Sequence, residues 1–133
     1  MGDLMGRYSS LSGVLMDKGL AELGDSLVNF LYSAAKSRVL GKFCGERVSN
    51  RILAEALRRA GLRAELPRRV DVQARGDAAE ALVAYAWISK IVGIDEAIEL
   101  LASKLKCMLD EGEFEASINA FAELLKLIWE RFK

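Results

Sequence analysis

Two short acidic motifs, about fifty residues apart, combine the residue types that bind hard metal ions. They are Leu23-Gly24-Asp25-Ser26, preceded by Glu22, and Asp77-Ala78-Ala79-Glu80-Ala81, and each stands in a stretch with helical patterning. Carboxylates repel one another, so they gather at low cost only where a cation offsets the repulsion. Oxygen ligands from two helices suit Mg²⁺ or Mn²⁺. The motifs therefore indicate a metal site for phosphoryl chemistry.

The second motif has a simpler alternative. Asp-x-x-Glu at the start of a helix forms a capping box, in which the two side chains satisfy unpaired backbone N–H groups. Caps are far commoner than metal sites, so Asp77 and Glu80 taken alone favour the cap.

The first motif is harder to explain without a ligand. Glu22 and Asp25 stand three residues apart inside a helix, where two acidic side chains repel each other. Gly24 costs a helix interior about 1 kcal/mol relative to alanine, which suggests that another backbone approaches closely there. The alternative is that Gly24 only permits tight helix packing, while Asp25 pairs with Lys18 or an arginine.

The composition indicates one all-α domain over residues 1–133. Of its residues 52% are hydrophobic and only one is proline, and strong helix formers dominate. The expected architecture is a single-domain helical bundle of about five to seven helices.

The apolar spacing predicts where the first two long helices lie. Residues 18–40 form an amphipathic helix that ends near Gly41, and a second helix runs from a cap at Ser49 or Asn50 to Gly61. Residues 62–76 are predicted to be a connecting loop, because they contain the only proline and close on a glycine.

The second half of the chain predicts three further helices. After Asp77 the pattern changes to Ala-Leu-Val-Ala-Tyr-Ala-Trp-Ile at residues 81–88, which is apolar on every side, as expected of a helix buried in the middle of a bundle, and Gly93 ends this helix. Amphipathic helices follow over about 95–109 and 113–131, so that residues 111–133 supply a C-terminal amphipathic helix.

The sequence excludes several classes of protein. It has no histidine, so it holds neither a Ser-His-Asp triad nor a zinc site with imidazole ligands. Cys44 and Cys107 are far apart and indicate neither zinc nor a disulfide framework. No stretch approaches the roughly twenty apolar residues that span a bilayer, and the N-terminus lacks a signal-peptide pattern. We therefore expect a soluble, cytoplasmic protein with no membrane partner.

Charge is distributed unevenly along a chain whose net charge is zero. Residues 36–75 hold eleven Lys/Arg against four Asp/Glu. A basic face of this kind binds a polyanion in a neutral protein, because counterion release depends on the charges that face the phosphates. The alternative is an ordinary solvated helix surface.

Three stretches, in this order, resemble the catalytic domain of the ribonuclease III family, particularly its small members without a separate double-stranded-RNA-binding domain. Residues 20–26, Leu-Ala-Glu-Leu-Gly-Asp-Ser, resemble the signature helix. Residues 48–62 resemble the middle helix through Val48-Ser49-Asn50, Leu53-Ala54 and Gly61-Leu62, and Asp77-x-x-Glu80-Ala81-Leu82 matches the second acidic motif. The resemblance covers roughly residues 15–92.

The chain also departs from the family's pattern. Longer members carry a metal-ligating glutamate four residues before the signature aspartate, where this chain has Ala21, and a further glutamate where it has Lys18. Glu22 lies one residue later, which turns its side chain by about 100° around the helix. The small bacterial members are similar in having alanine at this position.

The resemblance implies a Mg²⁺-dependent endoribonuclease, with Mn²⁺ as an alternative metal, that acts as a homodimer on double-stranded or structured RNA. Asp25, Asp77 and Glu80 would be the catalytic metal ligands and Glu22 an outer-shell ligand. Phosphates and 2′-hydroxyls across the minor groove would be contacted by one amide and six basic side chains. These are Asn50, Arg51, Arg58, Arg59, Arg68, Arg69 and Arg75.

Two other functions fit the same sequence. A catalytically degenerate RNA-binding protein on this fold is suggested by Ala21 and Lys18. A dimerisation or scaffold module would use the acidic residues as caps and surface charges, and the C-terminal amphipathic helix to bind a partner.

Overall fold

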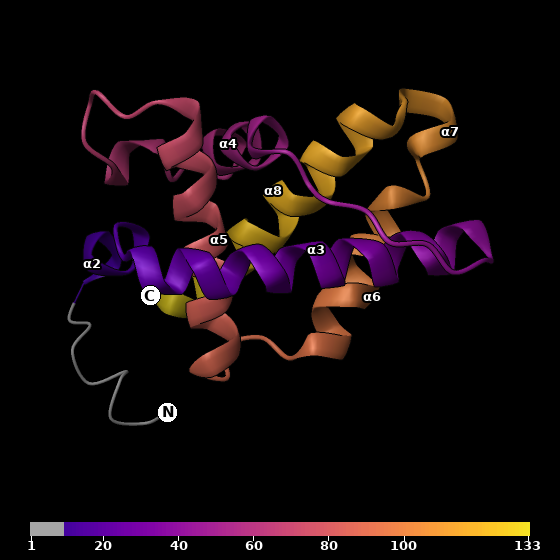
Figure 1. Cartoon of the computed structure of the whole chain (residues 1–133), viewed down its shortest axis with the longest axis horizontal. Helices are drawn as coiled ribbons and strands as arrows, with labels where there is room; N and C mark the ends of the chain where they lie inside the picture. The colour runs from indigo at the N-terminus through magenta and orange to yellow at the C-terminus, as the bar shows by residue number, and fades with distance from the viewer. Residues whose placement is uncertain (1–9) are drawn as a thin grey trace.

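The computed structural model describes residues 10–133, which fold into seven α-helices and one 3-10 helix without any β-strand (Figure 1). In chain order these are α2 (Leu11–Leu15), α3 (Lys18–Leu40), α4 (Asn50–Arg59), η1 (Arg63–Glu65), α5 (Val72–Ile88), α6 (Ile94–Leu105), α7 (Met108–Glu111) and α8 (Glu113–Phe132). The predicted all-α bundle is confirmed.

Helix α3 is the longest element, and its ends follow from local chemistry. Asp17 caps its start, since Oδ1 accepts a hydrogen bond from the Leu20 amide at 2.8 Å. Gly41 ends it in the left-handed conformation, with φ of 69°, which glycine adopts without strain. The predicted helix over residues 18–40 is therefore confirmed at both ends.

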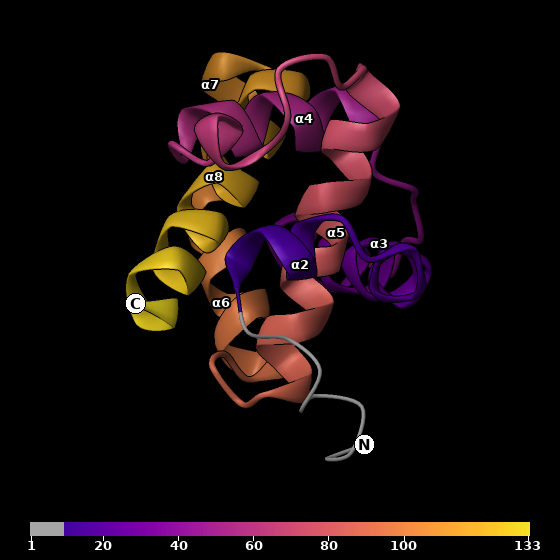
Figure 2. The same ribbon diagram turned by 90° about the vertical axis from the view of Figure 1, so that its left-hand side faces the viewer.

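Helix α5 runs through the centre of the bundle and packs against α2, α3, α4 and α8 (Figures 1 and 2). Its small apolar residues let these neighbours approach closely from several sides. Those that are completely buried include Ala78, Ala79, Ala81, Leu82 and Ala84. The prediction of a buried central helix is confirmed.

The start of α5 corrects the prediction of a loop over residues 62–76. The helix begins at Val72, because Asp71 caps it by accepting a hydrogen bond from the Ala74 amide at 2.8 Å. Asp77 consequently lies inside the helix, where no free N–H groups remain for it to cap. The capping-box explanation of Asp77 and Glu80 is wrong.

Two other predictions of helix boundaries are also corrected. The central helix ends at Ile88 rather than near Gly93, and Gly93 is instead the N-cap of α6. The helix predicted over 95–109 is divided into α6 and the short α7.

Across residues 10–133, no helix combines the length and the apolar character that crossing a membrane requires.

Candidate active site

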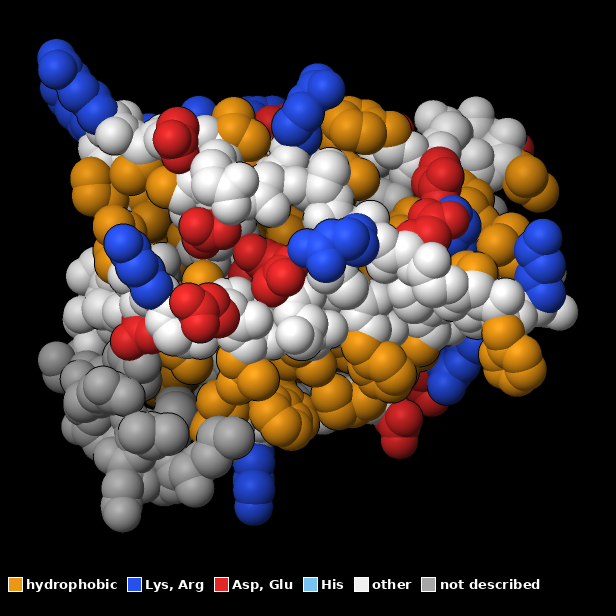
Figure 3. Space-filling view, in the orientation of Figure 1, with side chains coloured by type: hydrophobic (Ala, Val, Ile, Leu, Met, Phe, Trp, Pro, Cys, Tyr) orange, Lys and Arg blue, Asp and Glu red, His pale blue; other side chains and the backbone are white. Residues whose placement is uncertain are grey.

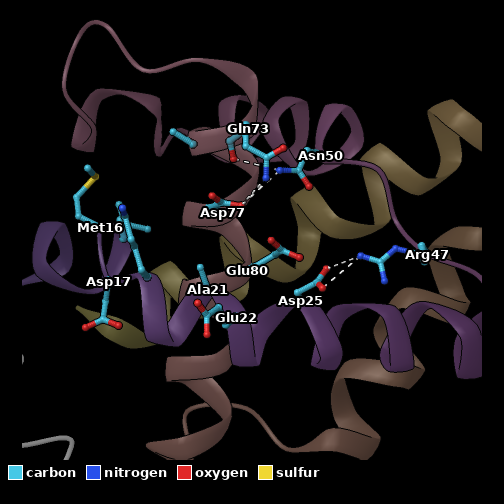
Figure 4. A pocket seen from close by; sticks show the side chains of 13 residues that line it. Met16, Asp17, Ala21, Glu22, Asp25, Arg47, Asn50, Gln73, Asp77 and Glu80 are labelled. Atoms are coloured by element: carbon cyan, nitrogen blue, oxygen red, sulfur yellow. Dashed lines mark hydrogen bonds and ion pairs between the residues drawn. The ribbon is translucent and has the colours of Figure 1, made fainter.

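The two acidic motifs meet where α3 crosses α5. A Cβ atom added at Gly24 would lie 2.0 Å from the carbonyl oxygen of Glu80. No side chain fits in that space, so only glycine allows the two backbones to come this close. The close approach expected from Gly24 is confirmed, and it places Asp25, the next residue, beside Glu80 (Figure 4).

Glu80 is the buried member of this group. Glu80 is only 3% exposed. Its Oε2 has no hydrogen-bond partner among residues 10–133. Burial raises the pKa of Glu80 to about 8, and a hydrogen bond with Asp25 and the charges of Asp25 and Asp77 act in the same direction. Without a cation, the surroundings of Glu80 therefore favour its protonated form.

Asp25 is the charged partner of Glu80. The hydrogen bond from the Glu80 carboxyl lowers the pKa of Asp25, Arg47 adds to this effect, and partial burial opposes it. Nη2 of Arg47 lies 3.3 Å from both carboxylate oxygens of Asp25. Asn29, one turn along α3, donates a hydrogen bond to Oδ1 of Asp25 at 3.3 Å.

Asp77 is positioned by two amides. Its Oδ1 accepts hydrogen bonds from Nε2 of Gln73 at 3.1 Å and from Nδ2 of Asn50 at 3.5 Å. Asn50 also donates to the carbonyl of Gln73 at 3.1 Å, and its side chain fills the space where a Cβ at Gly76 would stand, 2.7 Å from the Asn50 amide group. The start of α4 and the first turns of α5 are thereby joined beside the carboxylates.

These residues line one open cavity of about 560 Å³. Its wall includes Asp25, Asp77 and Glu80, together with exposed Glu22 and, one helical turn before Asp25, Ala21. A longer side chain at position 21 would enter the same cavity. Acidic side chains gather above α3 in the surface view, with a basic side chain next to them (Figure 3).

The arrangement is not a finished metal site. In the described part of the chain, no group of three or more Asp, Glu or Cys side chains is already placed to hold a metal ion. Asp25 faces Arg47, and Asp77 faces its two amides (Figure 4). The residues nevertheless suit a hard divalent cation, because they offer carboxylate oxygens from two helices and one of these, Oε2 of Glu80, is buried and unpartnered.

A family model described as ribonuclease III matches residues 18–133. The chain belongs to the ribonuclease III family. The match extends beyond the stretch of about 15–92 that carries the resemblance in the sequence, and it includes α6, α7 and α8. A search of curated proteins gave no significant match.

The residues expected to bind RNA lie in different surroundings in this member of the ribonuclease III family. Asn50 lines the acidic cavity, whereas Arg51, Arg59 and Arg75 line a neighbouring cavity of about 570 Å³ that also contains exposed Phe114. The guanidinium of Arg51 lies 5.7 Å from the centre of the Phe114 ring.

Two pairs of arginines lie outside the acidic cavity. Arg58 and Arg59 both bind Glu55, at 2.7 and 3.1 Å, and Arg59 also binds residues of α8. Arg68 and Arg69 are exposed in the loop that follows η1. The structure therefore brings only part of the expected set close to the carboxylates.

The sequence does not predict two polar residues of the site, Arg47 and Gln73. Arg47 stands in a connection between helices, and no spacing rule places it near Asp25. Gln73 lies four residues before Asp77, one helical turn away, so it would have been found had Asp71 been identified as the cap.

Proposed function

We propose that this protein is an endoribonuclease that depends on a divalent metal and cuts double-stranded or structured RNA. The observation that carries the proposal is the meeting of Asp25, Asp77 and Glu80 from two helices at one cavity, with Glu80 buried and its pKa raised to about 8. A protein gains little stability from holding a carboxylic acid in this way. Perturbed carboxylates in an open cavity are typical of functional sites.

Mg²⁺ is the metal that suits these ligands, and Mn²⁺ is an alternative with the same preference for oxygen. Asp25, Asp77 and Glu80 would hold it, with Glu22 in the outer shell. When bound, it would supply an activated water and stabilise charge on the phosphate and the leaving oxygen. Glu80 would give up its proton to act as a ligand, Asp25 would turn from Arg47, and the amides of Asn50 and Gln73 would orient Asp77.

RNA would lie over this cavity and the neighbouring basic one. Arg51 and Arg75 border the second cavity, and Arg68 and Arg69 extend from the adjacent loop. Arginine on this surface would contact phosphates and 2′-hydroxyls, so recognition would depend on the shape of the duplex rather than its sequence. Arg58 and Arg59 would contribute less, because carboxylates already bind their guanidinium groups.

A homodimer would use the apolar edge of α3. Phe30 and Leu40 on α3 and Phe43 just after it are exposed by 55%, 42% and 101%. Hydrophobic side chains gather along the lower edge of α3 in the surface view, on the side away from the acidic group (Figure 3). Such a patch is typical of a protein contact.

A second candidate is a noncatalytic RNA-binding protein on the same fold. Ala21 and Lys18 favour it, since both line the cavity at positions where longer family members carry glutamates. A site with fewer carboxylates and an added lysine would bind cations less tightly.

The test is incubation of the protein with a long RNA duplex in Mg²⁺, in Mn²⁺ and in chelator, with single-stranded RNA of the same sequence as control. The proposal predicts metal-dependent cuts in the duplex that leave 5′-phosphate and 3′-hydroxyl ends. Duplex binding without cuts in either metal would favour the noncatalytic candidate, and no binding at low salt would contradict both.

A further inference from the structure

Arg47 stands between two residues that are fixed to α3. The Oγ of Ser33 donates to the carbonyl of Glu46 at 3.1 Å and accepts from the Glu46 amide at 2.9 Å. On the other side, Oδ1 of Asn29 accepts from the Val48 amide at 2.7 Å. Side chains of the helix thus satisfy backbone groups that a connecting segment would otherwise leave to water. The backbone of Arg47 is held in place, and its side chain is the part free to move.

Further contacts fix the same segment. The amino group of buried Lys36 lies 2.5 Å from Oε1 of Glu46 and also binds Glu113 at the start of α8. Ser37 accepts a hydrogen bond from the Cys44 amide at 3.0 Å. The position of Arg47 beside the carboxylates is therefore a built feature of the fold.

The ion pair that Arg47 makes is loose. A single nitrogen lies 3.3 Å from each oxygen of Asp25, and the Arg47 side chain is 78% exposed. By comparison, two nitrogens of Arg131 bind Glu96 at 2.6 and 2.7 Å. Exposed pairs with poor geometry contribute little. Arg47 can therefore leave Asp25 at small cost.

We propose that Arg47 contacts an RNA phosphate in the active site, and that it exchanges Asp25 for that phosphate when a divalent cation occupies the carboxylates. The inference rests on the proposed function. Arg47 and the cation both require Asp25, and a cation there repels the guanidinium. A planar guanidinium at the edge of the cavity suits a phosphate, which it binds through paired hydrogen bonds.

Two consequences of opposite sign distinguish this role from a structural one. Loss of the Arg47 charge frees Asp25 and strengthens metal binding. The same loss removes a phosphate contact and weakens RNA binding. If Arg47 only stabilised the fold, its loss would weaken both metal binding and RNA binding.

The experiment compares Arg47→Gln with wild type and with Arg38→Gln. Arg38 is an exposed arginine on α3, the helix that carries Asp25. It lies about 20 Å from Asp25 along the helix axis, at 1.5 Å per residue. Mn²⁺ affinity is measured without RNA, from the paramagnetic resonance signal of the free ion. Duplex affinity is measured at several salt concentrations in Ca²⁺, which takes oxygen ligands, with a denaturing gel to show that the RNA stays intact.

Arg47→Gln is expected to bind Mn²⁺ about two- to five-fold more tightly than Arg38→Gln does. It is expected to bind the duplex about five- to ten-fold more weakly, with the slope of log affinity against log salt smaller by about one. Equal Mn²⁺ affinity in the two variants would overturn the exchange. An unchanged salt slope would overturn the phosphate contact. Failure of wild type to bind Mn²⁺ would instead overturn the proposed metal site.

Discussion

The Glu80→Gln variant tests whether the buried carboxylate of Glu80 destabilises the folded protein when it is ionised. The Glu80 carboxyl has an ordinary pKa of 4.5, and in the folded protein it has a pKa of about 8. Between these values the folded state holds a proton that the unfolded state has lost. The stability of the metal-free wild type therefore falls as pH rises from about 4.5 to about 8, and this contribution changes little above that range.

The magnitude follows from the pKa difference. Each tenfold change in proton affinity corresponds to about 1.4 kcal/mol, so ionised Glu80 costs the folded protein about 3 to 5 kcal/mol at high pH. Glutamine has nearly the same shape and no charge. We expect Glu80→Gln to match wild type within about 1 kcal/mol at pH 5 and to exceed it by several kcal/mol at pH 9.

The assay is urea unfolding in chelator at five pH values, followed by the same series in Mg²⁺. Glu99→Gln, the same chemical change at an exposed position on α6, is the control and should follow wild type throughout. Mg²⁺ should stabilise wild type at pH 8 more than it stabilises Glu80→Gln, because the variant lacks a ligand oxygen with negative charge. Parallel pH profiles for wild type and Glu80→Gln in chelator would show that Glu80 is not held protonated in the folded protein.

Three further predictions concern the crossing, the dimer and the missing ligand. Gly24→Ala should destabilise the fold by about 3 kcal/mol or more in urea unfolding, since its Cβ would lie 2.0 Å from a backbone oxygen, whereas Gly13→Ala in α2 should be neutral or stabilising. A small cost at Gly24 would contradict the close crossing. Phe30→Asp should convert a dimer to a monomer in light scattering with unchanged helix content, and a monomeric wild type would contradict the dimer proposal. Ala21→Glu should lower thermal stability in chelator and enlarge the stabilisation by Mn²⁺, and an unchanged Mn²⁺ response would show that position 21 does not face the metal.

Local chemistry explains which parts of the fold the sequence could predict. The bounds of α3 follow from its apolar spacing and from Gly41, both of which act within a few residues, and the structure adds an equally local cap at Asp17. The start of α5 was missed because Gly76 resembles a loop residue. Its actual role is to admit the Asn50 side chain from another helix, and that contact leaves no trace in local spacing.

In the candidate site too, local features could be predicted and contacts between distant parts of the chain could not. Gly24 predicted a close backbone approach, because glycine in a helix interior needs such a reason, but the partner could not be known until α5 was seen to cross there. Arg47 was not predicted at all. Its place depends on hydrogen bonds from Ser33 and Asn29 to backbone groups, and those follow from the path of the chain after α3.

The proposed active site is tested by comparing wild type with Asp77→Asn on one long RNA duplex in Mg²⁺. Asparagine keeps the size of the side chain and removes the negative charge, so the fold, followed by circular dichroism, should be preserved. If Asp77 is a metal ligand, wild type should cleave the duplex, and Asp77→Asn should lose at least about a hundredfold in rate while still binding the duplex. Equal cleavage by both proteins would contradict the assignment of Asp77, Asp25 and Glu80 to the active site.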